Sequence, residues 1–420
     1  MVFPFSYSTD PHVDLSSQDA FNQGAPFATF ARMRAEDPMA WTPEAQGRGF
    51  WSATRHEDVY ELNRDPTLLS SAHGIRMEDQ SDEEVQARRT FQESDPPQHT
   101  AFRMLVNHAF SRRTVDGFET QIRALVDDIL DTALDKVEFD AVEEIARRLP
   151  MLMLAQIMGV PPEDAQFLVE KGDALISNSD PDYTDFVIDK VDTEAYRLLP
   201  FRSPAAVELF DYANDLLDRM DRGEELGVLS IVHRAMKQAG LISRDEFRNF
   251  FCLLVAAGND TTRYSLAASL HAVANDPELL ATFQTPGFDM WDTAINELIR
   301  WASPTTHFRR TAMRDFERHG RQVRAGDKVI LWFVSANRDE GAFANPYAID
   351  VHRSPNRFLS FGQGGPHVCL GMWLAKLEVR VVLQEIARRV RAMEQTAEHA
   401  YLRSNFILGI KRLPLRMIAK

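Results

Sequence analysis

The sequence predicts a mainly α-helical protein with a minor β region, organised around one long central helix. Most of the chain has helical periodicity, and short strand-like runs stand towards both ends. Ser243 and Glu246 form a capping box that begins a helix ending near Asn275, about 33 residues and some 50 Å long. No linker, repeat or shift in composition divides the 420 residues, so we expect a single domain over residues 1–420.

The composition indicates an acidic globular protein. Lys plus Arg number 47 against 62 Asp plus Glu, and the net charge of −15 argues against binding nucleic acid or an anionic membrane. The longest uncharged apolar run, residues 250–257, is far shorter than the roughly 20 residues that span a bilayer. Residues 1–10 lack the layout of a signal peptide. With only Cys252 and Cys369, the chain is expected in the reducing cytoplasm.

The N-terminal part should alternate helices with a strand. Residues 27–35 and 57–63 are predicted to be helical, and residues 50–54 to form a strand. Residues 73–92 are polar and without a clean period, so we expect a loop there. Pro96 and Pro97 then begin a helix, where a missing N–H would have been unpaired in any case.

In that helix, His99 and Arg103 are four residues apart and so share one face. Two interpretations are open from the residues alone. The pair belongs to a solvated helix face, which is the commoner situation, or it holds a carboxylate of a bound ligand.

Residues 141–159 have a helical pattern rich in Leu, Met and Ile, and we interpret Met151, Met153 and Met158 as core residues. Residues 160–164 begin a new helix. Residues 176–203 have little periodicity, which indicates a long connection between helices.

The middle of the long helix, residues 258–262, contradicts its surroundings. Gly, Asn, Asp and Thr are weak helix formers, and a buried Asp is unfavourable. One interpretation is two helices, with Gly258 ending the first and Asp260 or Thr261 capping the second. The other is a functional site in one helix, where such conflicts are expected.

Further signals follow this helix. Glu297 and Arg300 are spaced as a common helix pair, which alone means little. Arg309 and Arg310 come after Pro304, either as exposed arginines or as ligand-binding groups. Residues 326–328 predict a turn and residues 329–334 a buried strand; residues 406–408 are placed at a hairpin tip that reaches a pocket.

The most informative stretch is residues 361–371, where four glycines and a proline surround Cys369 and a helical pattern begins at Met372. Glycines let the backbone turn and aim its N–H groups at the sulfur. A cysteine at a helix N-terminus is favoured as a thiolate, which makes it a suitable iron ligand. The alternative is a glycine-rich turn with a buried cysteine.

Residues 361–371 resemble the haem-ligand loop of the cytochrome P450 superfamily, with Gly365, His367, Cys369 and Gly371 on its pattern. Phe361 stands one residue further from Cys369 than in the commonest form. Some bacterial members that act on steroids, terpenoids and fatty acids share that length. The resemblance extends over roughly residues 50–410 and implies the P450 fold, with its long central helix over the haem.

The resemblance implies roles for the motif residues. Cys369 is the expected axial thiolate of haem b, and Asp260 with Thr261 is the expected acid-alcohol pair that delivers protons to dioxygen. The groups expected to neutralise the haem propionates are His99, Arg103, Arg310 and His367. Glu297 and Arg300 should form a buried lock with Arg353. The family often has a histidine where this chain has Phe358, so that propionate contact is not expected.

The implied activity is a monooxygenase that inserts one atom of O2 into a C–H bond of an apolar steroid, terpenoid or fatty-acid-like substrate. No flavin or nicotinamide fingerprint is visible in these residues, so we expect a separate ferredoxin with its reductase to supply the electrons. A basic patch for that partner is expected at Arg103, Arg112, Arg113, Lys376 and Arg380; the alternative is ordinary solvated charge. Rival functions are a peroxide-driven haem-thiolate enzyme or isomerase, and a non-catalytic haem or lipid carrier.

The substrate pocket is expected to be mostly apolar, as ligand pockets are. The segments expected to line it are residues 73–92, residues 176–203, Val255, Ala256, residues 304–308 and Ile407.

Overall fold

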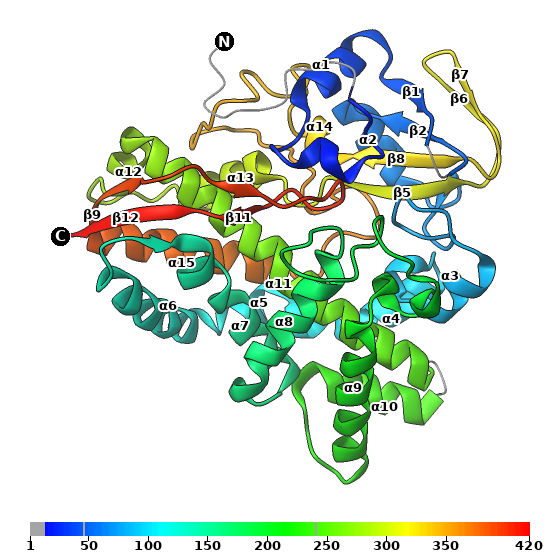
Figure 1. The fold of residues 1–420 in the computed structure, drawn as a ribbon, viewed down its shortest axis with the longest axis horizontal. Helices are drawn as coiled ribbons and strands as arrows, with labels where there is room; N and C mark the ends of the chain where they lie inside the picture. Colours follow the sequence, from blue (N-terminus) through cyan, green and yellow to red (C-terminus); the bar gives the residue numbers. More distant parts are fainter. Residues whose placement is uncertain (1–12, 45–46, 240–241) are drawn as a thin grey trace.

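The computed structural model describes residues 13–44, 47–239 and 242–420, so the prediction on residues 1–10 lies outside the described residues. Helices make up most of the molecule, and the largest sheet stands beside them with β1, β2, β5 and β8 (Figure 1). The α-helices are α1 (Phe27–Glu36), α2 (His56–Arg64), α3 (Asp82–Arg88), α4 (Gln98–Val106), α5 (Arg112–Asp116), α6 (Glu119–Leu134), α7 (Arg148–Met158), α8 (Ala165–Ile176), α9 (Ala205–Asp221), α10 (Gly227–Ala239), α11 (Arg244–Asn275), α12 (Pro277–Phe283), α13 (Trp291–Ala302), α14 (Phe333–Ala336) and α15 (Met372–Arg389).

The strands form small sheets whose members are distant in the sequence. They are β1 (Met39–Thr42), β2 (Phe50–Ala53), β3 (Leu69–Ser70), β4 (Phe139–Asp140), β5 (His307–Ala312), β6 (Phe316–Arg318), β7 (Arg321–Val323), β8 (Lys328–Trp332), β9 (Val390–Gln395), β10 (Ala400–Tyr401), β11 (Ile410–Arg412) and β12 (Pro414–Ala419). The largest sheet has the order β1-β2-β8-β5-β3, with β2 and β8 parallel. In this sheet Arg310 of β5 lies opposite Val329 of β8, which fixes the register of β5. The Arg310 side chain then reaches Asn63 of α2.

The long helix α11 runs through the centre of the molecule (Figure 1). Both bonds of the predicted capping box are present: Glu246 N donates to Ser243 Oγ at 3.1 Å, and Ser243 N donates to Glu246 Oε2 at 2.8 Å. The helix continues for 32 residues without a break at 258–262, so the two-helix interpretation is wrong. Because most of its side chains are buried, tertiary packing outweighs the weak helix propensity of 258–262.

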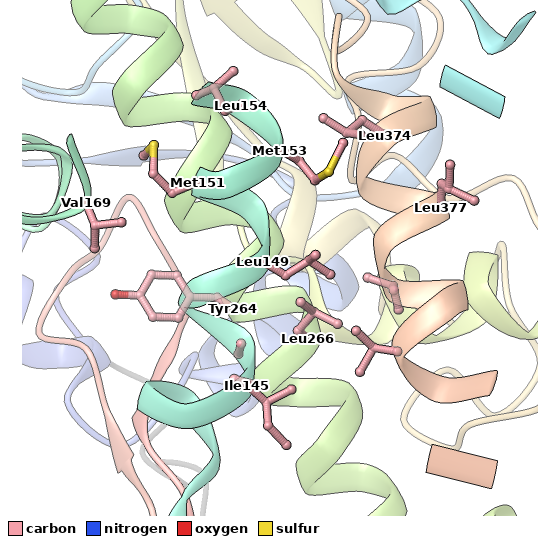
Figure 2. Packing of buried hydrophobic residues seen from close by; sticks show 14 of the residues in the cluster. Ile145, Leu149, Met151, Met153, Leu154, Val169, Tyr264, Leu266, Leu374 and Leu377 are labelled. Atoms are coloured by element: carbon pink, nitrogen blue, oxygen red, sulfur yellow. The ribbon is translucent and has the colours of Figure 1, made fainter. Parts of the chain in front are cut away.

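Helix α7 packs between α11 and α15. Figure 2 shows Leu149 of α7 beside Leu266 of α11, and Met153 of α7 directed towards Leu374 of α15. The approach to α11 is close, because a Cβ on Gly258 would lie 2.5 Å from Cδ2 of Leu154. The three methionines predicted as core, Met151, Met153 and Met158, are fully buried. This packing holds α11 and α15 at a fixed separation.

One prediction about local structure is wrong, and a second is confirmed except at its end. Residues 73–92 are not all loop, because α3 occupies Asp82–Arg88 and Ser81 caps it through a second capping box with Glu84. The strand predicted at 329–334 is β8, which ends at Trp332, and residues from Phe333 begin α14. The long connection predicted at 176–203 is confirmed, since it contains only short 3-10 turns at Glu194–Tyr196 and Pro200–Arg202.

Candidate active site

The cysteine loop is a tight turn that presents Cys369 at the N-terminus of α15. Cys369 N donates to the Phe361 carbonyl at 2.9 Å, and Phe361 N donates to Gln363 Oε1 at 3.0 Å. The N–H groups of Gly371 and Met372 both bond to the Cys369 sulfur. Desolvation by the surrounding protein raises the pKa of the thiol, and these two N–H groups with nearby Arg103 oppose that rise. The side chain remains accessible, as a metal ligand must be.

Two glycines let this loop pack directly against α2. Gly364 has φ +95°, and a Cβ there would lie 2.5 Å from the Tyr60 ring. A Cβ on Gly365 would lie 2.3 Å from the Asn63 carbonyl oxygen. Asn63 Nδ2 also donates to the Gly362 carbonyl at 3.0 Å. The glycine-rich sequence is therefore required by the close approach of α2 as well as by the turn.

Beside the cysteine, the structure gathers His99, Arg103, Arg310 and His367 from α4, β5 and the loop. The rings of His99 and His367 have centroids 4.1 Å apart. Arg310 is buried and donates to Asn63 Oδ1 at 3.1 Å and to the Arg309 carbonyl at 2.8 Å. None of the four ring nitrogens of the two histidines has a hydrogen-bond partner among the described residues.

The electrostatics of this cluster call for an anion. Burial, with the nearby arginines, lowers the pKa of His99 to about 4 and that of His367 to about 2. Burial also lowers the pKa of Arg310 to about 10. The two histidines are thus neutral near pH 7, whereas Arg103 and Arg310 carry charge. Within the described part of the chain no carboxylate bonds to either arginine, although the charge of Asp95 acts on His99 and Arg310. Two ligand carboxylates, such as the propionates of haem, would supply the missing partners.

Behind the cysteine loop, Glu297 is the centre of a buried lock. It accepts from Arg300 Nε at 2.7 Å, from Arg353 Nε at 3.0 Å and from the backbone N–H of Asp350 at 2.9 Å. Burial alone would raise the pKa of Glu297, but the two arginines outweigh it and hold the pKa below its usual range. Asn356 Nδ2 also donates to this carboxylate, at 3.1 Å. The expected partner Arg353 is thus in place.

On the α11 side, Thr261 and Asp260 face in different directions. Thr261 Oγ1 donates back to the Ala257 carbonyl at 3.0 Å, and both residues line a cavity. Asp260 is fully buried away from that cavity and accepts from Arg263 Nη2 at 2.8 Å and from Ser177 Oγ at 3.1 Å. Burial raises the pKa of Asp260 to about 8, against the opposing charge of Arg263.

A buried chain of charges continues from Asp260 towards the surface. Arg263 Nη1 donates to Asp173 Oδ1 at 2.7 Å, and Arg147 Nη2 donates to Asp173 Oδ2 at 2.7 Å. The Arg147 side chain is 21% exposed, whereas that of Arg263 is fully buried. Sequence reasoning missed Asp173, Arg263 and Asn63. For Asp173 the sequence did hold a signal of a buried charge, because this aspartate stands among the apolar residues of the α8 segment.

The cavity over α11 has a volume of ≈ 570 Å³. Its lining comes largely from the predicted segments, and the hairpin residues Phe406 and Ile407 reach it. Val255 is an exception, because it packs towards Gly172 on α8. Charged and apolar side chains both line it, among them Arg76, Glu78, Arg88, Glu93, Phe201, Arg202, Leu253, Ala256, Ala257, Thr261, Phe308, Phe406 and Ile407.

The residues predicted to dock a redox partner lie around the start of α15. Arg112 and Lys376 both lie near the Trp373 ring, at 5.1 and 5.2 Å from its centroid. Arg112 and Arg113 are exposed. Arg112 forms long ion pairs of 3.7 Å with Asp116 and with Asp292, and Arg380 forms a closer one of 3.0 Å with Glu119. Arg103 is close enough to Cys369 to act on its pKa, so it belongs to the cluster described above.

A thiol at a helix N-terminus lies beside Arg103, Arg310 and two histidines whose ring nitrogens have no partner in the described part of the chain. Such a site fits haem with a thiolate ligand, with Cys369 to hold the iron. Comparison with known proteins agrees. The family model described as Cytochrome P450 matches residues 288–415. The methyl-branched lipid omega-hydroxylase of Mycobacterium tuberculosis is 33% identical over 419 residues, covering 96% of this chain and 94% of the relative. The linalool 8-monooxygenase of Pseudomonas putida is 32% identical over 417 residues, covering 97% and 99%.

Solved structures give the same result. A Mycobacterium marinum cytochrome P450 in complex with pseudoionone superposes with a TM-score of 0.84 at 32% identity, covering 93% of this chain and 94% of that one. A Bacillus megaterium P450 in complex with testosterone has a TM-score of 0.81 at 25% identity, covering 93% and 98%.

The chain belongs to the cytochrome P450 family and has the P450 fold. It is a P450 monooxygenase that hydroxylates apolar substrates, and the family binds haem b through a cysteine thiolate. Among the described residues, no helix combines the length and apolar character needed to cross a membrane.

Proposed function

We propose that this P450 hydroxylates a steroid, terpenoid or fatty-acid-like molecule with electrons from a separate ferredoxin and its reductase. The observation that supports the substrate class is the ≈ 570 Å³ cavity over Thr261, which is within the usual size of small-molecule sites. Relatives named for a methyl-branched lipid, linalool and a steroid support the same range. Overall, substrate, O2, two electrons and two protons give the hydroxylated product and water.

Bound haem would supply the activation of dioxygen. Cys369 would ligate the iron. The propionates would be bound by His99, Arg103, Arg310 and His367. Gly371 and Met372 direct their N–H groups at the cysteine sulfur and so favour the thiolate. The side chain of Thr261 faces the cavity and can present its hydroxyl to a ligand there.

Asp260 and Thr261 are proposed to control proton delivery. Because burial raises its pKa, Asp260 exchanges a proton near neutral pH more readily than an exposed aspartate does. Since its carboxylate bonds to Ser177 and Arg263 on the far side from the cavity, transfer to Thr261 needs a water molecule or a rotation of the aspartate. The chain Arg263, Asp173 and Arg147 connects that carboxyl to solvent.

The replacement Thr261→Ala is expected to uncouple electron use from product formation. Without the hydroxyl, proton delivery at the cavity becomes disordered, and product formed per NAD(P)H should fall about 10-fold or more while peroxide is released. The measurement is product and peroxide yield per NAD(P)H in a reconstituted system. Thr262→Ala is the matched control, and Thr261→Ser should restore part of the yield. Unchanged coupling in Thr261→Ala would refute the assignment.

The ferredoxin is proposed to dock at Arg112, Arg113 and Lys376, around Trp373. Electrostatic docking is screened by salt. The rate of ferredoxin-driven reduction should therefore fall several-fold as salt is raised, and Arg113→Glu should lower it at low salt. Arg324→Glu, at an exposed arginine after β7, serves as the control. A rate that does not respond to salt would remove this docking site.

The proposed reaction is tested in a reconstituted assay with ferredoxin, reductase and NAD(P)H. The compounds tested are steroids, terpenoids and fatty acids that shift the haem spin state when they bind. Turnover with peroxide alone would favour the peroxide-driven alternative. Binding without any product would favour a carrier. We also place the protein in the cytoplasm, a proposal supported by two cysteines that are both free.

A further inference from the structure

Arg76 is held in the wall of the cavity between two aromatic rings. Its guanidinium carbon lies 5.3 Å from the ring centre of Phe201 and 5.2 Å from that of Phe406. Phe201 belongs to the connection between α8 and α9, and Phe406 to the segment between β10 and β11. The Arg76 side chain is 12% exposed. A guanidinium enclosed in this way has little freedom, so it is preorganised to bind a ligand.

The backbone beside it is strained. Phe201 has φ 59° and Arg202 has φ 51°, and left-handed conformations are unfavourable for residues with side chains. In this conformation the Phe201 ring lies beside the Arg76 guanidinium, at 5.3 Å. Consecutive residues of this kind are found where a structure holds a functional group in place.

The hydrogen-bonding capacity of Arg76 is largely unused. Its Nη2 lies 3.4 Å from Oε1 of Glu78, which is long for a charge-assisted bond. Its Nε is buried with no partner among the described residues. Two neighbouring arginines of the same cavity differ, because both bond to Glu84: Arg88 Nη2 at 2.9 Å and Arg202 Nε at 3.1 Å. Among the three arginines of the described lining, Arg76 therefore has the longest contact to a carboxylate and a buried Nε that no acceptor uses.

The other charges of the cavity leave this corner positive. Three guanidinium groups, those of Arg76, Arg88 and Arg202, face the carboxylates of Glu78 and Glu84. Burial raises the pKa of Glu93 to about 7, so this third carboxyl is partly neutral at physiological pH. Further acidic residues of the lining are bound elsewhere: Glu44 and Asp79 to Lys328, Asp189 to Arg403, and Asp14 to the backbone of Ser16.

The part of the cavity formed by α11 has a different character. Leu253, Ala256 and Ala257 face it beside Thr261, and Phe308 and Ile407 add to this apolar lining. The cavity therefore combines one available cation with an apolar surface over the catalytic helix. A ligand that matches both has an acid group on an apolar body.

We propose that Arg76 binds the carboxylate of the substrate, and that the substrate class is an apolar acid. The inference rests on the proposed hydroxylation and narrows its substrate. A carboxylate can accept two parallel N–H bonds from one guanidinium, which fixes the orientation of the chain. With its acid group at Arg76, the substrate directs its apolar end towards Thr261, so oxidation occurs at a carbon remote from the carboxyl group.

The test compares ligands that differ only in the acid group. Hexadecanoate, methyl hexadecanoate and hexadecan-1-ol are titrated into the haem-loaded full-length protein, with binding followed by the spin-state shift and by calorimetry. A steroid carboxylate and its methyl ester form a second arm that distinguishes straight-chain from ring-bearing acids. The wild type should bind each matching acid about 10-fold or more tightly than its ester, the effect of a hydrogen bond to a charged group.

The variant Arg76→Gln should lose this preference while its affinity for the esters stays within about 3-fold. Arg76→Lys should keep part of it. Arg202→Gln is the matched control: it lies in the same cavity, but its charge is already bound by Glu84, so the preference should persist.

The proposed binding of the carboxylate by Arg76 is overturned if the wild type binds acid and ester equally tightly in both arms. This comparison needs no variant. A preference that survives in Arg76→Gln overturns it as well. If neutral terpenoids or steroids are hydroxylated while acids bind no more tightly than their esters, the proposed role of Arg76 fails but the proposed hydroxylation stands. If no compound of any class is hydroxylated, the proposed function itself fails.

Discussion

Replacement of Cys369 by serine is expected to abolish hydroxylation and the spectral signature of a thiolate ligand. The Cys369 sulfur receives the N–H groups of Gly371 and Met372, a site built for an anionic ligand atom. A serine hydroxyl is not deprotonated at neutral pH and lacks the electron donation of sulfur. Since loss of a group that only supports a ligand lowers activity by about 10–100-fold, loss of the ligand itself should exceed about 100-fold.

The measurements are turnover with ferredoxin, reductase and NAD(P)H, and the Soret band of the reduced carbon monoxide adduct. Cys252→Ser is the matched control, because Cys252 is buried in the core and free. It should keep both activity and the far-shifted Soret band. A normal thiolate spectrum in Cys369→Ser would show that another atom binds the iron.

Glu297→Gln is expected to produce a large loss of stability. The replacement leaves the charges of Arg300 and Arg353 buried without their carboxylate, although Arg300 Nη1 would still donate to the Asn337 carbonyl. Breaking a buried ion pair by removing one partner typically costs about 3–5 kcal/mol. Urea unfolding of the purified protein, followed by tryptophan fluorescence and by haem absorbance, measures the change.

Glu225→Gln is the comparison for this experiment. Glu225 forms an ion pair with Arg234, but the Glu225 side chain is 74% exposed, so its loss should change stability little. Equal effects of the two replacements would mean that Glu297 does not hold the region behind the cysteine loop.

The sequence predicted best those features that depend on local chemistry. The capping box at Ser243 and Glu246 marked the start of α11, and the glycines around Cys369 marked the turn before α15. Residue spacing placed Glu297 and Arg300 together. Such signals are read within a few residues, because their partners lie within one turn of chain.

Features that depend on distant partners were not predictable in the same way. Local polarity at 258–262 left open whether one helix or two would form, and the buried partners Arg263 and Asp173 come from α11 and from α8. The helix α3 was missed although Ser81 and Glu84 carry the same capping signal as α11. The unpaired donors of Arg76 depend on where Phe201, Phe406 and Glu84 lie, which no pattern in the sequence gives.

One amide group has a consequence for assembly of the holoprotein. The side chain of Asn63 donates to Gly362 with its nitrogen and accepts from Arg310 with its oxygen. The strand β5, which carries Arg310, and the turn that carries Cys369 are therefore coupled through a single residue of α2. Insertion of haem should order both in one cooperative step, and Asn63→Ala should separate that step into two.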